Sequence, residues 1–201
     1  MNLLPIFPLD LVLFPGAPLP LHIFEPRYKE MIADCIAQKM AFGVARAKES
    51  AVAEVGCTAV ILNVAKQYDD GRMDIAAEGV RRFTIADLNH DRDFLQAEVA
   101  YFDDDEPLQA RQTDQDTALQ LHEQLFETLD QEYDLDASKP MLSFQLVNVL
   151  PVDLDFKQSM LEMKSEQERL ETLIEYYRVT IPQVEKTIRT REKASGNGHV
   201  S

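Results

Sequence analysis

Glycine and proline divide this chain into two unlike halves. Five of the seven glycines lie between Gly16 and Gly79, the other two are Gly196 and Gly198, and residues 80–195 contain none. Six of the ten prolines fall within the first 26 residues. Residues that form turns and interrupt helices are typical of short strands, whereas a long segment without glycine favours helices. The sequence therefore predicts an α+β protein, with strands first and helices second.

The first half is predicted to form a small, strongly bent β-barrel with one helix. That helix is expected over residues 26–38, because the apolar side chains there recur at the spacing of a one-sided helix. Asp69, Asp70 and Gly71 favour a tight turn with a positive φ angle, which predicts a hairpin between the strands on either side. Strands are expected near residues 2–7, 10–14, 19–24, 40–46, 58–68, 72–78, 82–88 and 94–101.

The second half is predicted to be a helical bundle. A long helix is expected over residues 107–131 and a shorter one over 138–150. Three more are expected to begin at Asp153, a capping residue, at Ser165, whose capping box includes Glu168, and near Thr180. The expected domains and tail are residues 1–103 for the barrel, 104–193 for the bundle and 194–201 for a disordered tail.

The charge of the chain argues against several classes of partner. Its formal net charge is −15, and residues 101–136 hold twelve acidic side chains but one basic residue, Arg111. Nucleic acids and anionic membranes both require a positive surface, so neither is expected as a partner. The N-terminus has no signal-peptide pattern, and no apolar run is long enough for a membrane span. The only cysteines, Cys35 and Cys57, suit a reducing cytoplasm, although one disulfide between them stays open.

No motif for catalysis or cofactor binding is present. Phosphate-binding loops need clustered glycines at a helix start, and the four histidines have no Cys or His partner at zinc-ligand spacing. The acidic run Asp103–Glu106 lacks the glycine turn of a calcium loop, so we expect a solvated connection. His122 is expected at the boundary of an apolar stripe. We therefore expect no cofactor, metal or catalytic residue, with a hydrolase assembled from distant residues as an alternative.

Many short blocks of the sequence resemble the N-terminal domain family of Lon proteases, in the same order, over roughly residues 3–178. The resemblance is carried by Leu4–Leu9, Val12–Gly16, Leu19–Tyr28, Phe42–Val44, Gly56–Ala59, Asp70–Arg72, Gly79–Phe83, Leu150–Pro151, Lys157–Gln158 and Glu168–Leu170. It implies a barrel related to the RNA-binding fold of pseudouridine synthases and archaeosine transglycosylases (PUA-like), followed by a helical bundle.

The resemblance also implies a function. In Lon proteases this region helps to engage polypeptide substrates and precedes an ATPase and a protease module, whose motifs this sequence lacks. We therefore expect a non-catalytic, cytoplasmic module that binds polypeptide, either an unfolded client or a protein partner. A PUA-like barrel that binds a small molecule or RNA is the alternative, and the oligomeric state stays open.

The segment Leu19–Phe24 is the candidate binding element, because it is apolar on both faces. Leu19, Leu21 and Ile23 are expected to point one way and Pro20, His22 and Phe24 the other. One face lines the core, so the second either packs under a helix or forms an exposed patch that binds protein. In the exposed case, the expected peptide-binding residues are His22, Phe24, Glu25, Tyr28 and Arg82, with Glu25 and Arg82 at the rim of the patch. Glu25 is otherwise expected to pair with Arg27.

Overall fold

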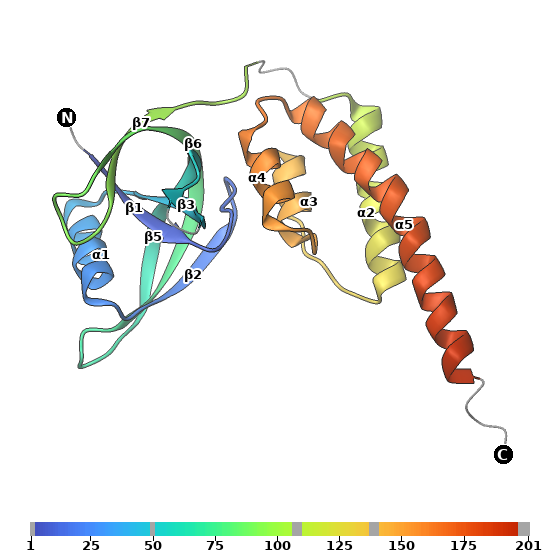
Figure 1. The fold of residues 1–201 in the computed structure, drawn as a ribbon, viewed down its shortest axis with the longest axis horizontal. Coiled ribbons are helices and arrows are strands. Elements are labelled where there is room, and N and C mark those ends of the chain that lie inside the picture. Colours follow the sequence, from blue (N-terminus) through green and yellow to red (C-terminus); the bar gives the residue numbers. More distant parts are fainter. Residues whose placement is uncertain (1–2, 49–50, 106–109, 137–140, 197–201) are drawn as a thin grey trace.

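The fold consists of a β-sheet half followed by a helical half, as predicted (Figure 1). The computed structural model describes residues 3–48, 51–105, 110–136 and 141–196. Its sheet half contains β1 (Leu4–Leu9), β2 (Pro18–Ile23), α1 (Pro26–Gln38), β3 (Phe42–Lys48), β4 (Ala51–Val52), β5 (Val55–Gln67), β6 (Met73–Asn89) and β7 (Gln96–Tyr101). Its helical half contains α2 (Gln112–Leu129), α3 (Leu142–Val149), α4 (Leu154–Glu162) and α5 (Glu166–Gly196). The α+β fold class is thus confirmed.

The sheet bends until it closes on itself. Its strands follow the order β1-β7-β6-β5-β3-β4, and β1 also pairs with β3 in parallel, which closes a ring of β1, β7, β6, β5 and β3. The result is not a regular barrel, because the long β6 extends beyond the ring. There, residues 73–78 of β6 pair with β2 on one side and with β5 on the other. We call this three-stranded extension, formed by β2, residues 73–78 of β6 and residues 60–67 of β5, the β2–β6–β5 arm.

Two glycines occupy positions where a side chain does not fit or strains the backbone. Gly71 has a φ angle of 79° in the turn between β5 and β6, as the Asp-Asp-Gly pattern predicts. At Gly79, an added Cβ would lie 2.1 Å from the carbonyl oxygen of Phe14. Gly79 also exchanges backbone hydrogen bonds with Gly16 and Ala17. The β1–β2 loop is therefore held directly against β6.

That loop is the first correction to the sequence-based expectation. Residues 10–14 do not form a strand. Val12, Leu13 and Phe14 are apolar because this part of the loop is buried between the sheet and the helices, where the ring of Phe14 stacks on that of Phe144 in α3 with centroids 5.3 Å apart. A buried loop and a short strand have the same composition, so the pattern alone does not separate them.

α4 and α5 begin where their capping residues predict, but the last expected helix is not separate. The start expected for α3 at residue 138 lies outside the described residues, which place the beginning of α3 at Leu142. The carboxylate of Asp153 accepts a hydrogen bond from the backbone N–H of Phe156, and Ser165 accepts one from that of Glu168. The expected new start near Thr180 is wrong, because α5 continues through Pro182 to Gly196. Pro182 removes one backbone hydrogen bond, while the buried Ile181 keeps the helix packed in the core.

The end of α5 also bears on the expected tail. Residues 194–196 are helical rather than disordered, and residues 197–201 lie outside the described residues. The proposed division into domains at residue 103 stays a prediction. None of the helices in the described ranges combines the length and apolar character that crossing a membrane requires.

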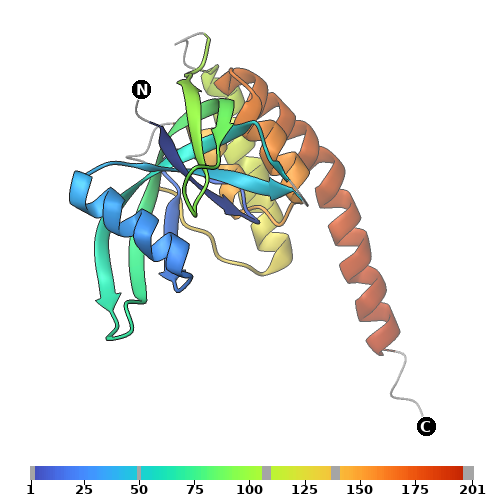
Figure 2. The ribbon, with the colours of Figure 1, turned by 60° about the vertical axis from the view of Figure 1, so that its left-hand side comes forward.

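Both halves share one hydrophobic core. In Figure 1, α3 and α4 lie between the sheet and the paired helices α2 and α5. The side-chain amide of Gln158 in α4 donates to the backbone carbonyl of Val55, and Arg46 of β3 forms an ion pair of 2.6 Å with Asp155. These contacts fix the helices against one side of the sheet, whereas α1 and the hairpin end of the β2–β6–β5 arm lie away from the helices (Figure 2).

Candidate functional site

The predicted alternation along β2 is present. Leu19 and Ile23 are buried, whereas Pro20, His22 and Phe24 are exposed. Of the two alternatives for the outer face, packing under a helix is therefore wrong. The Phe24 side chain is 58% exposed, which is high for a large apolar residue.

Beside Phe24, an aromatic cluster covers the end of the β2–β6–β5 arm. The ring of His22 lies 6.1 Å from that of Phe24 and meets the ring of Tyr68 edge-on at 5.8 Å. The carboxylate of Asp74 accepts a hydrogen bond of 2.9 Å from the Tyr68 hydroxyl, and its other oxygen is hydrogen-bonded to His22 Nδ1. The hydrogen bonds from His22 and Tyr68 lower the pKa of Asp74. We call His22, Phe24, Tyr68 and Asp74 the hairpin cluster.

Two further predicted residues lie next to this cluster but have structural roles. Glu25 pairs with Arg27 at 2.8 Å, as expected for the structural alternative, and its carbonyl starts α1. Tyr28 is buried, with its ring stacked on that of Phe7 at 4.1 Å. Burial raises the pKa of the Tyr28 hydroxyl. A ring held in the core in this way is not available as an exposed anchor.

The fifth predicted residue, Arg82, lies elsewhere, so its expected place at the rim of the patch is wrong. Its side chain is 2% exposed and points toward the helices. The guanidinium donates to the backbone carbonyls of Leu161, at 3.0 Å, and Met163, and pairs with Asp104. Its five donors suit this position, because a guanidinium can satisfy several carbonyls and a carboxylate at once.

Arg82 belongs to a buried ionic network that joins the two halves. Arg169 of α5 is fully buried and forms a two-pronged pair with Asp104 at 2.9 and 2.6 Å. It also pairs with Glu166, at 2.8 Å, and donates to the hydroxyl of Ser143, at 2.9 Å. Two positive and two negative groups therefore balance each other between β6, α3 and α5.

The network corrects the expectation that the acidic run is solvated. Asp103 and Asp105 are exposed, but Asp104 is nearly buried between two arginines. Burial alone would raise the pKa of Asp104, yet the hydrogen bonds and charges of Arg169 and Arg82 outweigh burial and lower it. In the sequence, Arg82 follows another arginine, Arg81, and Arg169 follows Glu168, so no local pattern marks either residue as buried.

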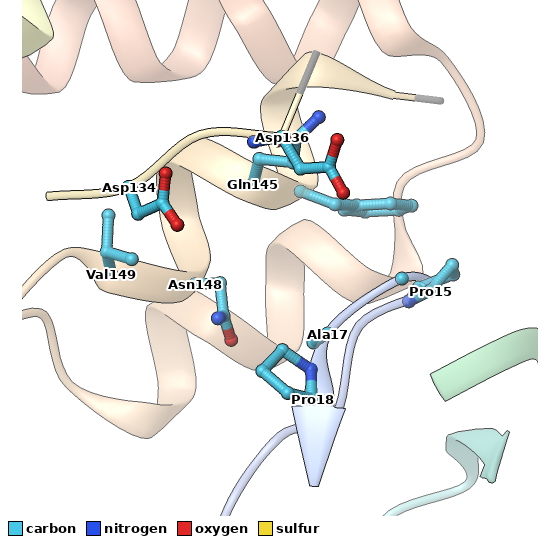
Figure 3. A pocket seen from close by; sticks show the side chains of 10 residues that line it. Pro15, Ala17, Pro18, Asp134, Asp136, Gln145, Asn148 and Val149 are labelled. Atoms are coloured by element: carbon cyan, nitrogen blue, oxygen red, sulfur yellow. The ribbon is translucent and has the colours of Figure 1, made fainter. Parts of the chain in front are cut away.

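A cavity of about 350 Å³ opens between the β1–β2 loop and the helical half. Figure 3 shows Pro18 facing Asn148 of α3, Pro15 at the other end of the loop, and the carboxylates of Asp134 and Asp136 on the opposite side of the cavity. Phe144, Gln145 and Val149 complete the lining with backbone from Gly16 and Ala17. The sequence analysis did not anticipate this cavity, because its walls come from two segments more than 100 residues apart.

The groups that carry chemistry in many proteins are buried and inert here. Cys35 and Cys57 are free thiols in the core, and burial raises the pKa of Cys57 to about 12. His122 is fully buried rather than at a boundary, and its Nδ1 lies 2.7 Å from the Tyr177 hydroxyl. Burial lowers the pKa of His122 to about 4. Within the described parts of the chain, no three His, Cys, Asp or Glu residues form a group that could hold a metal ion.

Comparisons with known proteins agree on one family. The model of the ATP-dependent protease La (LON) substrate-binding domain matches residues 3–178. Lon protease of Buchnera aphidicola is 23% identical over 94% of this chain, and that of Parabacteroides distasonis is 28% identical over 52%. The matches cover 27% and 14% of those proteins, so this chain spans about a quarter or less of their length.

Solved structures show the same fold. A Lon N-terminal domain protein from Xanthomonas campestris superposes with a TM-score of 0.71 and 27% identity, covering 88% of this chain and 99% of that one. The N-terminal domain of a Mycobacterium avium complex Lon protease gives a TM-score of 0.63 at 17% identity, covering 88% and 98%. The second likeness shows the fold alone.

Proposed function

Because this chain belongs to the family of substrate-binding domains of ATP-dependent protease La (Lon), we propose that it binds segments of unfolded polypeptide on the β2–β6–β5 arm. The binding requires no chemical step by the domain itself. Such a module presents apolar side chains that an unfolded chain covers when it binds, while folded proteins offer few such segments.

One observation carries the proposal. The described residues include eight large apolar side chains that are strongly exposed, and four of them, Phe24, Ile36, Leu62 and Val64, belong to the arm or to its immediate surroundings. Surface apolar residues are ordinary when single. Three of them, Ile36, Leu62 and Val64, line one groove at the arm, and this concentration on a protein with a net charge of −15 favours a binding surface. Phe24 lies on the other face of the arm from Val64.

The hairpin cluster supplies the proposed anchor. Phe24 is exposed, and its neighbours His22 and Tyr68 hold each other and Asp74 in fixed positions. A rigid aromatic group loses little conformational entropy when it is covered, which is why aromatic residues dominate binding hot spots. His22 and Phe24 thus remain proposed binding residues, whereas Glu25, Tyr28 and Arg82 support the fold.

The test is the binding of a permanently unfolded polypeptide. Reduced and carboxymethylated α-lactalbumin, labelled with a fluorophore, is titrated with the domain and followed by fluorescence anisotropy. We expect Phe24→Ala to raise the Kd about tenfold, the usual loss for a hot-spot residue. Val179→Ala is the matched control, because Val179 on α5 is equally exposed, at 56%.

Both variants should keep the far-UV circular dichroism spectrum of the parent, since neither side chain is in the core. An unmodified domain that does not bind the unfolded polypeptide would overturn the proposed function. Equal Kd values for Phe24→Ala and Val179→Ala would remove the hairpin cluster from it.

The cavity beside Pro15 favours a second candidate, a small-molecule site. Its volume of about 350 Å³ lies at the lower end of typical ligand pockets, and its lining combines apolar groups with the amide of Asn148. A ligand there should raise the Tm of the domain, and Val149→Trp should fill the space and abolish the rise. Screening a set of cytoplasmic metabolites by thermal shift tests this candidate, and an unchanged Tm with every compound argues against it.

The proposal includes a cytoplasmic location and no nucleic-acid partner. The two free cysteines support the first and the acidic composition supports the second. A gel-shift titration with RNA at moderate salt checks the second point, and a complex of micromolar affinity would contradict it.

A further inference from the structure

One edge of the β2–β6–β5 arm is open. β5 pairs with β6 along its length, but its pairing with β3 ends at Ala59, which lies opposite Phe42. In the described parts of the chain, no strand pairs with the other edge of β5 from Val60 to Gln67. Backbone N–H and C=O groups of alternate residues on this edge therefore face away from the sheet.

The edge is open because of how α1 ends. Lys39 adopts a left-handed conformation, with a φ angle of 53°, and caps α1. The chain then enters the row of β3 only at Phe42. The space next to residues 60–67, where β3 would continue if it were longer, is left to solvent. In Figure 2, β5 (teal) is the outer strand of the arm below α1.

A groove of about 370 Å³ runs between this edge and the end of α1. Ile36 of α1 and Leu62 and Val64 of β5 line it, and these side chains are 41%, 60% and 40% exposed. Leu62 and Ala65 have no partners in β6, because register shifts lie between Ile61 and Asn63 and between Val64 and Lys66. The groove therefore offers apolar contacts directly beside unpaired backbone groups.

The opposite edge of the arm lacks this combination. β2 pairs with β6, and two of its six residues, Pro18 and Pro20, are prolines. Proline has no backbone N–H to donate, and natural proteins use it to block pairing at sheet edges. Residues 60–67 contain no proline.

We propose that the open edge of β5 binds an extended, apolar polypeptide segment by strand addition, with alternate side chains of that segment in the groove beside α1. This inference rests on the proposed function and specifies the form in which the polypeptide binds. Only an extended backbone satisfies a row of N–H and C=O groups, and the two faces of an added strand alternate, so one set of its side chains faces the groove.

The charge of the groove restricts the segment further. Lys39 is the only charged residue in its lining. Lys66, farther along the same strand, points to the other face, where its Nζ lies 4.4 Å from the centroid of the Tyr68 ring. On a chain with a net charge of −15, a groove that carries only positive charge is complementary to an apolar segment flanked by acidic residues. Lysine or arginine in the segment would meet like charge at the groove.

The test uses a fluorescein-labelled peptide of alternating valine and threonine with aspartates at its end. A second peptide has the same side chains but carries N-methyl groups on alternate backbone amides, along the edge that would pair with β5. A third peptide has lysines in place of the aspartates. We expect the first peptide to bind, and both modified peptides to bind at least about tenfold more weakly.

The matched pair of protein variants is Leu62→Lys and Val179→Lys. Both replace an apolar residue that is more than half exposed, one at the groove and the other on α5. Leu62→Lys removes an apolar contact and puts a charge at the strand edge, so it should weaken binding of the first peptide about tenfold at high salt, where attraction between the new lysine and the aspartates is screened. Val179→Lys should leave the binding unchanged under the same conditions. Circular dichroism and Tm should match the parent for both.

Three results would overturn the proposal. The first is equal binding of the N-methylated peptide, which would indicate apolar contact without strand pairing. The second is an unchanged affinity of Leu62→Lys for the first peptide. The third is a combination of two findings: the first peptide does not bind, and sedimentation shows a dimer of the parent that Leu62→Lys dissociates. The open edge would then pair two copies of this chain instead of a peptide. If unfolded α-lactalbumin still binds in a Phe24-dependent way, only strand addition fails; if it does not bind either, the proposed function fails too.

Discussion

Acidification should destabilise this domain through a single buried histidine. His122 is fully buried in α2, stacked on Phe126 at 4.5 Å, and its only polar partner is the Tyr177 hydroxyl, while Nε2 has none among the described residues. Burial lowers its pKa from 6.5 to about 4. The native state therefore keeps this ring neutral at a pH where the unfolded chain already binds a proton.

Proton linkage gives the direction and the size of the change in the free energy of unfolding. Below pH 6.5 the unfolded state binds more protons at this site than the native state, so the free energy of unfolding falls as the pH falls. The stability that depends on a neutral His122 is fully present above pH 6.5 and is lost progressively as the pH falls to 4. The loss amounts to about 2 kcal/mol between pH 7.5 and 5, and to about 3 kcal/mol at pH 4.

Urea unfolding at several pH values measures the free energy of unfolding, with far-UV circular dichroism as the signal because the chain has no tryptophan. His122→Asn is the control, since its amide still offers Tyr177 a hydrogen-bond partner but does not titrate in this range. The variant should be less stable at neutral pH, and the gap to the parent should shrink by about 2 kcal/mol on going to pH 5. A constant gap over this range would refute the reasoning, because all other titrating groups are common to both proteins.

Three further predictions concern the core. Asp104→Asn leaves two buried arginines with one carboxylate and should lower the free energy of unfolding by about 3 kcal/mol; a loss below about 1 kcal/mol in urea unfolding would indicate that the network is solvated. Gly79→Ala places a methyl group against the carbonyl of Phe14 and should cost about 3 kcal/mol by the same assay, whereas a neutral effect would mean that the β1–β2 loop moves freely. Cys35 and Cys57 should react with a thiol reagent in urea but not in the native state, and rapid labelling of the folded domain would contradict their burial.

Local patterns predicted local structure well. The apolar spacing of residues 26–38 and Pro26 at the start gave the bounds of α1, and Asp70 with Gly71 gave the hairpin turn. Asp153 predicted the start of α4 through its own side chain. These features depend on residues a few positions apart, so the sequence contains all that determines them.

Features that depend on distant partners were not predictable in the same way. His122 and Asp104 are polar residues of kinds that usually lie on the surface. Their burial is favourable only because the fold brings Tyr177 next to His122 and two arginines next to Asp104. The outer face of β2 was identified from its alternation, but its exposure follows from where α1 packs. The open edge of β5 follows from the pairing order of the strands, which no short pattern specifies.

The central claim is that the β2–β6–β5 arm binds unfolded polypeptide. Its most direct test is an NMR titration of the isotope-labelled domain with unfolded α-lactalbumin, reading every backbone amide. We expect shifts at residues 60–67, at the end of α1 and around Phe24, together with slower hydrogen exchange of the outward-facing amides of β5. Shifts confined to the cavity beside Pro15 or to α5, with the arm unchanged, would contradict the claim.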